Sequence, residues 1–255
     1  MKLIMLGSGT SAGVPRIGND WGQCDPAEPR NRRTRVSIIV ENAAGRRILV
    51  DTSPDLRHQL LARNIADLDA VIWTHDHADH CHGIDELRGL YHRRRSPLPG
   101  YGRAYCMDSL QRRFDYAFTG NRGYPAMVTA NYLDDHQAIQ GFSVRAVDQP
   151  HGPVLSTGLR FEADNISMVY ATDFSEVTGE MLQCYADCDL LVVDCLRRDP
   201  HPTHAHLDLS LELATQCHAR RTVLTHMDKS MDYRTVLATT GDGIEPGFDG
   251  LIVEF

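Results

Sequence analysis

The sequence contains no hydrophobic run long enough to cross a membrane, and the apolar stretch at the N-terminus, Leu3 to Leu6, is too short for a signal peptide. We therefore expect a cytoplasmic protein without membrane attachment. Excess positive charge is also missing, because 26 Lys and Arg stand against 34 Asp and Glu, giving a formal net charge of −8. This balance argues against binding of extended nucleic acid, since each phosphate contact normally needs Lys or Arg.

Two further features are absent from the sequence: a pattern of paired cysteines and a dinucleotide-binding motif. The seven cysteines are odd in number and scattered along the chain, which does not suggest a set of disulfides. Gly7, Gly9 and Gly13 do not fit the dinucleotide motif G-x-G-x-x-G, and Arg33 rather than an acid lies about twenty residues further on. We interpret residues 7–15 as a loop in which glycine lets the backbone pass close to an active site.

What the sequence does contain is a dense group of metal-ligating side chains. Three imidazoles and one carboxylate fall within six residues, at His75, His77, Asp79 and His80. The apolar run 68–73 predicts a buried strand that ends at this group, and helical spacing follows it. Clustered ionisable groups are costly on a loop without a cation, so the stretch predicts a metal site. Imidazole and carboxylate ligands suit zinc, manganese or iron.

The pattern His-x-His-x-Asp-His is the signature of the metallo-β-lactamase superfamily, which this sequence resembles. The resemblance implies an α/β protein with a four-layer αββα sandwich, formed as one domain over residues 1–255. It also implies a hydrolase with two divalent metal ions and a water or hydroxide between them. The implied ligands are His75, His77 and His151 for the first ion, Asp79, His80 and His226 for the second, and Asp173 as the bridge.

Some of these residues have plainer explanations when each is taken alone. His151 could be a loop histidine and Asp173 a helix cap. Their order, and their position at the ends of predicted strands 142–147 and 166–171, favour ligation instead. Asp51 ends an apolar strand upstream of the motif, where the superfamily has an Asp that orients a ligand imidazole.

Within the superfamily the sequence is most similar to the cyclic phosphodiesterases of the bacterial carbon–phosphorus lyase pathway. The similarity covers Gly7-x-Gly9, Gly13-Val14-Pro15, the ligands and the segment 206–209. It implies hydrolysis of a small, cyclic ribosyl or nucleotide-like phosphodiester, with Asp79 in the catalytic centre and His206 protonating the leaving oxygen. The alternative for His206 is the cap of a surface helix. His201 and His204 lie nearby but lack the motif match.

One feature departs from those phosphodiesterases, which carry an additional structural zinc held by several cysteines and a His after the last ligand. Here the corresponding regions offer only Cys24 and Asp228-Lys229, from which a full zinc site cannot be built. Three other functions stay open: a tRNA 3′-processing nuclease, a thioester or lactone hydrolase, and a non-hydrolytic carrier resembling the pyrroloquinoline quinone biosynthesis protein.

Two regions have no clear role in the sequence. The arginines between Arg30 and Arg35 are more typical of a solvated loop than of a phosphate-anchoring patch. Residues 96–135 could form a wall of the substrate site or a contact in a homodimer. Within them we expect a strand over Arg103–Cys106, a helix from Asp108 to Phe118 and a loop over 119–125.

Overall fold

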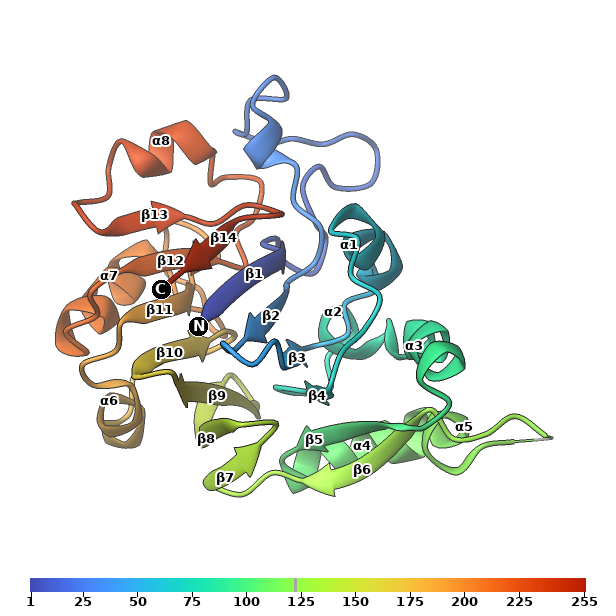
Figure 1. The fold of residues 1–255 in the computed structure, drawn as a ribbon. Coiled ribbons are helices and arrows are strands. Elements are labelled where there is room, and N and C mark those ends of the chain that lie inside the picture. The colour runs from blue at the N-terminus through green and yellow to red at the C-terminus, as the bar shows by residue number, and fades with distance from the viewer. Residues whose placement is uncertain (122) are drawn as a thin grey trace.

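Two mixed β-sheets lie face to face in the computed structural model, which describes residues 1–121 and 123–255 (Figure 1). The strands of the first sheet are β1 (Lys2–Gly7), β2 (Ser37–Glu41), β3 (Arg47–Val50), β4 (Ala70–Ile72), β5 (Leu98–Gly102), β6 (Val128–Tyr132) and β14 (Ile252–Glu254). Those of the second are β7 (His136–Ile139), β8 (Phe142–His151), β9 (Val154–Ala163), β10 (Ile166–Ala171), β11 (Leu190–Asp194), β12 (Thr222–Thr225) and β13 (Ile244–Pro246). The spatial orders are β14-β1-β2-β3-β4-β5-β6 and β13-β12-β11-β10-β9-β8-β7.

Helices cover the outer face of each sheet. Those packed on the first sheet are α1 (Leu56–Ala62), α2 (Ala78–Cys81), α3 (Leu87–Arg94), α4 (Ala104–Arg113) and α5 (Asp115–Thr119), and those on the second are α6 (Gly179–Tyr185), α7 (Leu207–Gln216) and α8 (Tyr233–Leu237). Short 3₁₀ turns occupy Pro29–Asn31 and Ile84–Glu86. In the described ranges, none of the helices combines the length and the apolar character that a membrane crossing requires. The predicted four-layer αββα sandwich is confirmed.

The central strands consist of continuous apolar runs because both of their faces are buried. Leu3 and Met5 of β1 pack between the two sheets. Ile4 and Leu6, which alternate with them, pack toward the helices outside the first sheet. A sheet covered on both faces needs apolar side chains at every position of its central strands, so the polar alternation of a half-exposed strand is missing.

The chain between α3 and β6 differs from the sequence-based expectation. The strand predicted over Arg103–Cys106 is wrong, because this stretch begins helix α4 and the strand, β5, lies just before it. Gly100 in β5 disfavours a strand by propensity. A Cβ at this position would come within 2.7 Å of the Trp73 ring and 2.5 Å of Val128. Strand β5 can pack against Trp73 only because it carries glycine there.

The helix predicted from Asp108 to Phe118 is also inaccurate. It begins earlier, at Ala104, and divides into α4 and α5 at Phe114, whose φ of −126° and ψ of 38° are not helical. Arg122, in the loop predicted over 119–125, lies outside the described residues. All seven cysteines are buried and free, in agreement with the expected lack of disulfides.

Arg33 is an exception in the basic cluster that the sequence predicts to face solvent. Its side chain is buried and donates to the backbone oxygens of Met231 at 2.6 Å and Asp228 at 3.2 Å. Its guanidinium also lies 3.8 Å from the Cys24 sulfur. These contacts tie the N-terminal segment to the chain just after His226. A buried guanidinium thus joins the two regions in which the resemblance would lead one to expect a structural zinc.

Candidate metal centre

The predicted ligands gather where parallel strands of both sheets end. Strands β3 and β4 are parallel in the first sheet, as are β10, β11 and β12 in the second. At or just beyond their carboxyl ends lie Asp51, His75, Asp173, Asp194 and His226. Asp51, Asp173 and His226 have left-handed backbones, with φ of 64°, 56° and 58°. Such conformations cost roughly 1–3 kcal/mol each in non-glycine residues and cluster at functional sites.

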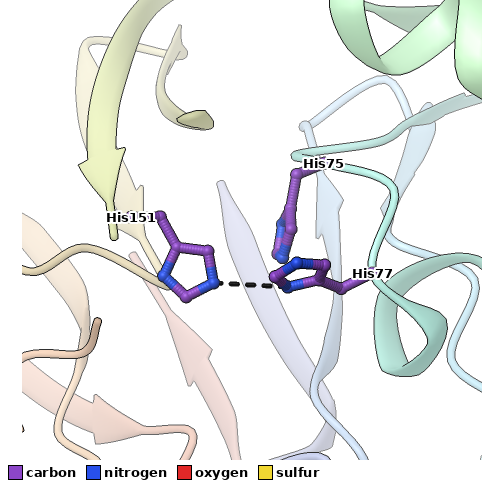
Figure 2. Close-up of side chains that lie close together, drawn as sticks. All are labelled: His75, His77 and His151. Atoms are coloured by element: carbon purple, nitrogen blue, oxygen red, sulfur yellow. Dashed lines mark hydrogen bonds between the residues drawn. The ribbon is translucent and has the colours of Figure 1, made fainter. Parts of the chain in front are cut away.

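Three imidazoles form the first group, shown in Figure 2. His75 and His77 come from the loop between β4 and α2, whereas His151 ends β8 on the other sheet. His77 Nδ1 and His151 Nε2 lie 3.3 Å apart, and one ring nitrogen of each residue lies within 4.8 Å of the others. His151 is held from behind, because its Nδ1–H donates to the Thr203 carbonyl oxygen at 2.6 Å. Its Nε2 is therefore left to face the other two rings.

Asp79, His80 and His226 form the second group. Asp79 Oδ2 lies 3.4 Å from His226 Nε2 and 3.5 Å from His80 Nε2. Behind His80, Asp51 Oδ2 accepts a hydrogen bond from the ring Nδ1–H at 2.7 Å, and its Oδ1 accepts from the Thr74 backbone N–H at 2.8 Å. A carboxylate in this place fixes the tautomer of the ring and turns Nε2 toward a metal. The structure thus places Asp51 where the predicted orienting role requires it.

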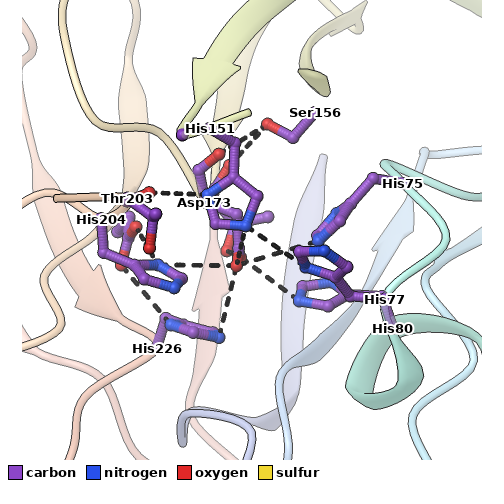
Figure 3. A network of polar contacts seen from close by, with 12 residues as sticks. His75, His77, His80, His151, Ser156, Asp173, Thr203, His204 and His226 are labelled. Atoms are coloured by element: carbon purple, nitrogen blue, oxygen red, sulfur yellow. Dashed lines mark hydrogen bonds and ion pairs between the residues drawn. The ribbon is translucent and has the colours of Figure 1, made fainter. Parts of the chain in front are cut away.

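Asp173 lies between the two groups, as Figure 3 shows. Its carboxylate oxygens are 3.3 Å from His80 Nε2 and 3.6 Å from His226 Nε2 in the second group. They are 3.8 Å from His151 Nε2 and 4.0 Å from His75 Nε2 in the first group. Asp79, the other carboxylate among the predicted ligands, lies 3.5 Å from His80 Nε2 and 3.4 Å from His226 Nε2, which both belong to the second group. The position of Asp173 fits the bridging role expected of it.

Burial and mutual charge shift pKa values in opposite directions within the cluster. Burial, together with nearby His80, holds the pKa of His75 well below its usual value. Burial also disfavours the charged form of His80, but Asp173 and Asp79 outweigh it and raise the pKa of His80 well above its usual value. Burial opposes ionisation of Asp173, yet His226 and His80 hold its pKa well below the usual range. The cluster therefore contains buried ionised carboxylates, which need cationic partners.

Unpaired buried nitrogens show that these residues fit metal ions. In residues 1–121 and 123–255, Nε2 of His75 and Nε2 of His80 are buried and form no hydrogen bond. Leaving such an atom unpaired costs about 1–3 kcal/mol. Both nitrogens face Asp173, and imidazole with carboxylate is the usual donor set of zinc and related divalent ions.

Comparison with known proteins agrees with this geometry. A profile described as the β-lactamase superfamily domain matches residues 46–227, a range that includes every ligand candidate. The chain belongs to the metallo-β-lactamase superfamily. A solved diphosphatase from the PhnP family is 34% identical, with 100% of this chain and 96% of that chain covered and a TM-score of 0.90. This superfamily member is therefore PhnP-like.

Two other relatives share the superfamily fold. A curated octanoyltransferase from Porphyromonas gingivalis is 33% identical over 98% of this chain, but the chain spans only 51% of that relative's length. The zinc-bound structure of PqqB from Methylobacterium extorquens has a TM-score of 0.81 at 19% identity, with 100% of both chains covered. At that identity the likeness to PqqB concerns the fold alone.

His206, the predicted proton donor, and its neighbour His204 lie differently relative to the candidate ligands. His206 is the N-cap residue of α7, and its side chain neither caps the helix nor lines the hollow over the ligands. His204 lines that hollow, stacks on the His226 ring with centroids 4.8 Å apart, and has its Nδ1 3.6 Å from Asp173 Oδ1. Burial opposes the charged form of His204, but Asp194, 3.0 Å from Nδ1, raises the pKa of His204 to about 9.

The hollow over the ligands has a volume of about 160 Å³. Its wall includes the hydroxyl residues Ser11 and Thr203 and the apolar residues Pro153 and Val154. Ser11 belongs to the glycine-rich loop, so this loop does reach the site. Gly152 brings the β8–β9 turn against Thr203, because its φ is +60° and a Cβ would come within 2.5 Å of the threonine methyl.

Sequence reasoning passed over Asp194 and ranked His204 below His206. A signal for Asp194 was present, because it ends an apolar strand just as Asp51 does. For His204 the signal was ambiguous, since two histidines stand two residues apart and only the folded chain shows which one turns toward the ligands.

Proposed function

We propose that this protein is a dinuclear metal-dependent phosphodiesterase with a small substrate. The observation that carries the proposal is the position of Asp173 between two imidazole groups, with His204 beside the same carboxylate. The 34% identical relative, which is named a diphosphatase, supports chemistry at phosphorus.

In this proposal each group of ligands holds one divalent ion. The residues concerned are His75, His77 and His151 for one ion, Asp79, His80 and His226 for the other, and Asp173 for both. Two such ions lower the pKa of a water molecule, orient it and neutralise charge on phosphoryl oxygens. The chain keeps the rings in place through Asp51 behind His80 and the Thr203 carbonyl behind His151.

We assign protonation of the leaving group to His204. In diester hydrolysis, the oxygen of water forms a bond to phosphorus, one phosphorus–oxygen ester bond breaks, and the departing oxygen takes up a proton to leave as an alcohol. His204 lies on the wall of the hollow beside the ligands, whereas His206 does not line it. A positioned imidazole contributes a typical ~10²–10⁴-fold in rate. His204 thus takes the role that the resemblance implied for His206.

The size and charge of the site favour a small substrate. A hollow of about 160 Å³ fits one phosphodiester with its nearest substituents, such as a cyclic ribosyl or nucleotide-like ester. The net charge of −8 gives little support to a surface that would hold extended nucleic acid.

Turnover of metal-replete protein on a panel of phosphorus substrates tests the proposal. The panel contains a cyclic ribose phosphate, a cyclic nucleotide, a nitrophenyl diester, a nucleoside diphosphate and a short RNA. We expect hydrolysis of small diesters that is lost with a chelator and restored by zinc or manganese. If protein carrying its ions hydrolyses none of them, the proposal is wrong, and a preference for RNA would favour the nuclease alternative.

Hydrolysis of an acyl thioester is a second candidate. It is favoured by the 33% identity to part of an octanoyltransferase and by the apolar residues Pro153 and Val154 on the wall of the hollow. An octanoyl thioester added to the same panel separates the two functions. A thiolate leaves without a proton donor, so thioester turnover should survive His204→Ala, whereas hydrolysis of an alkyl phosphodiester should not.

A further inference from the structure

Asp194 is a buried carboxylate that the proposed function does not use as a ligand. It ends β11, and its register partner in β12 is Thr225, the residue just before His226. Adjacent strand ends therefore bring Asp194 beside His226, and the aspartate is 0% exposed. A carboxylate buried this fully must have partners that offset its desolvation.

The two oxygens of Asp194 face two different imidazoles. Oδ2 accepts a hydrogen bond from His204 Nδ1–H at 3.0 Å. Oδ1 lies 3.6 Å from His226 Nδ1. In the described part of the chain, Asp194 Oδ1 and His226 Nδ1 are both buried and have no hydrogen-bond partner, so each is the nearest polar group available to the other.

The His226 ring is held between carboxylates on both sides. Its Nε2 faces Asp79 Oδ2 at 3.4 Å and Asp173 Oδ1 at 3.6 Å, while its Nδ1 faces Asp194. A carboxylate that accepts from the Nδ1–H of a metal-binding histidine fixes which nitrogen is free for the metal. The rings of His204 and His226 also stack on each other at an interplanar angle of 16°.

A structural role in anchoring helix α7 does not explain why the Asp194 carboxylate is buried beside two imidazoles. Helix α7 is tied to β11 through the backbone oxygen of Asp194, which accepts from Ser210 Oγ at 2.6 Å. The carboxylate takes no part in that bond. A third metal ion is the other alternative, since Asp194, His204 and His226 offer ligand atoms within 4.8 Å of one another. However, a hydrogen bond between Asp194 and His204 already occupies two of those atoms.

We propose that Asp194 is a positioning residue that holds the metal ligand His226 with one carboxylate oxygen and the proton donor His204 with the other. One side chain then orients both a metal ligand and the acid beside the metal site. The role of His204 in this inference rests on the proposed function. The role of His226 requires only that the site binds metal ions.

The test substitutes Asp194→Asn and measures zinc affinity by competition with a chelator and turnover of two diesters. An asparagine side chain can accept through only one atom, so at least one imidazole loses its acceptor. We expect a loss of zinc affinity of roughly 10–100-fold. We also expect turnover of an alkyl diester to fall much more than turnover of a nitrophenyl diester, whose phenolate leaves without a proton.

Two matched variants distinguish this positioning role from a general loss of structure or of metal binding. Asp51→Asn leaves one acceptor oxygen for both the His80 ring and the Thr74 backbone N–H. Asp51 does not contact His204, so zinc affinity should fall while the two diesters slow equally. Asp189→Asn changes a carboxylate at the other end of β11, where it contacts Ser167 and Arg220, and should alter neither quantity. Unchanged zinc affinity in Asp194→Asn, equal slowing of its two diesters, or a third zinc in the wild type would each overturn the inference.

Nitrogen NMR of the histidine rings in the zinc-loaded wild type needs neither a variant that folds nor a known substrate. We expect the hydrogen of His226 on Nδ1, and its absence there would overturn the inference. If the protein hydrolyses no phosphodiester, the proposed function fails, but this measurement and the zinc affinities still decide whether Asp194 positions His226.

Discussion

The two sheets contribute to the metal centre in different ways. The first sheet supplies its ligands from one short segment, His75 to His80, which comprises the loop after β4 and the first turn of α2. The second sheet supplies His151, Asp173 and His226 from three separate strand ends. A loop can bring several donors together through its local conformation. Strand ends meet only when the register of the whole sheet is correct.

The difference shows how the halves divide their tasks. The segment 75–80 offers ligand atoms to both groups, and Asp51 accepts a hydrogen bond behind His80. The second sheet places Asp173 between the groups and His204 next to it. In the proposed function, most of the ligands therefore come from one segment of the first sheet, while the carboxylate expected to bridge and the proposed proton donor come from the second. The predictions below test this division.

The largest effect should come from Asp173→Ala, compared with His77→Ala. Asp173 approaches imidazoles of both groups, so its removal should lower the affinity for both ions by more than the roughly 10–100-fold typical of an orienting residue, and turnover should be lost. His77 belongs to one group only, so one ion should remain. Elemental analysis of the two variants checks this. Retention of both ions by Asp173→Ala would show that the carboxylate does not bridge.

A smaller effect should follow from His204→Ala. Turnover of an alkyl or ribosyl diester should fall by about 10²–10⁴-fold, and turnover of a nitrophenyl diester by far less, with both ions retained. His206→Ala is the matched control, because this residue stands two positions away and does not line the hollow. Steady-state rates on both substrates distinguish the variants. A leaving-group-dependent loss in His206→Ala instead would restore the assignment made from the sequence.

The smallest effect concerns a buried carboxylate that serves the fold of the first sheet rather than the metals. Asp249 accepts hydrogen bonds from the backbone and hydroxyl groups of Ser8 and Thr34. Burial nevertheless raises the pKa of Asp249 to about 6 from 3.8. Because the folded state binds this proton more tightly, its stabilisation is complete below about pH 4 and is lost as the pH rises through about 6.

Urea unfolding of metal-free wild type and Asp249→Asn between pH 4 and 7 measures this effect. The difference in free energy of unfolding between the two proteins should shift by about 2.4 kcal/mol against the wild type across that range. The contributions of all other titrating groups cancel in the difference. A difference that does not change with pH would mean that the four donors cancel the effect of burial, and one that changes in the opposite direction would mean that they outweigh it.

The sequence was most informative where the chemistry is local. The spacing of His75, His77, Asp79 and His80 predicted the metal-ligand segment, the apolar runs predicted the central strands, and the superfamily resemblance implied the four layers. The sequence misled where long-range packing decides: Gly100 lies in a strand because Trp73 occupies the space of a side chain. Arg33 is buried for the same kind of reason, because its partners lie on the chain after the last ligand.

The choice between His204 and His206 shows the same limit within the site. Both have the right chemistry and nearly the same position in the sequence. The fold distinguishes them, because the strand end at Asp194 holds His204 while His206 begins α7. A residue whose role depends on what the neighbouring strand brings to it cannot be identified from its own spacing.

The most direct test of the metal centre is the number of ions per chain. Protein purified without chelators and then equilibrated with zinc or manganese should contain two ions per chain by elemental analysis, because two groups of ligands share Asp173. Asp173→Ala measured in the same way should contain neither in full occupancy. One ion or fewer in the metal-replete wild type would contradict a dinuclear centre built jointly by the two sheets.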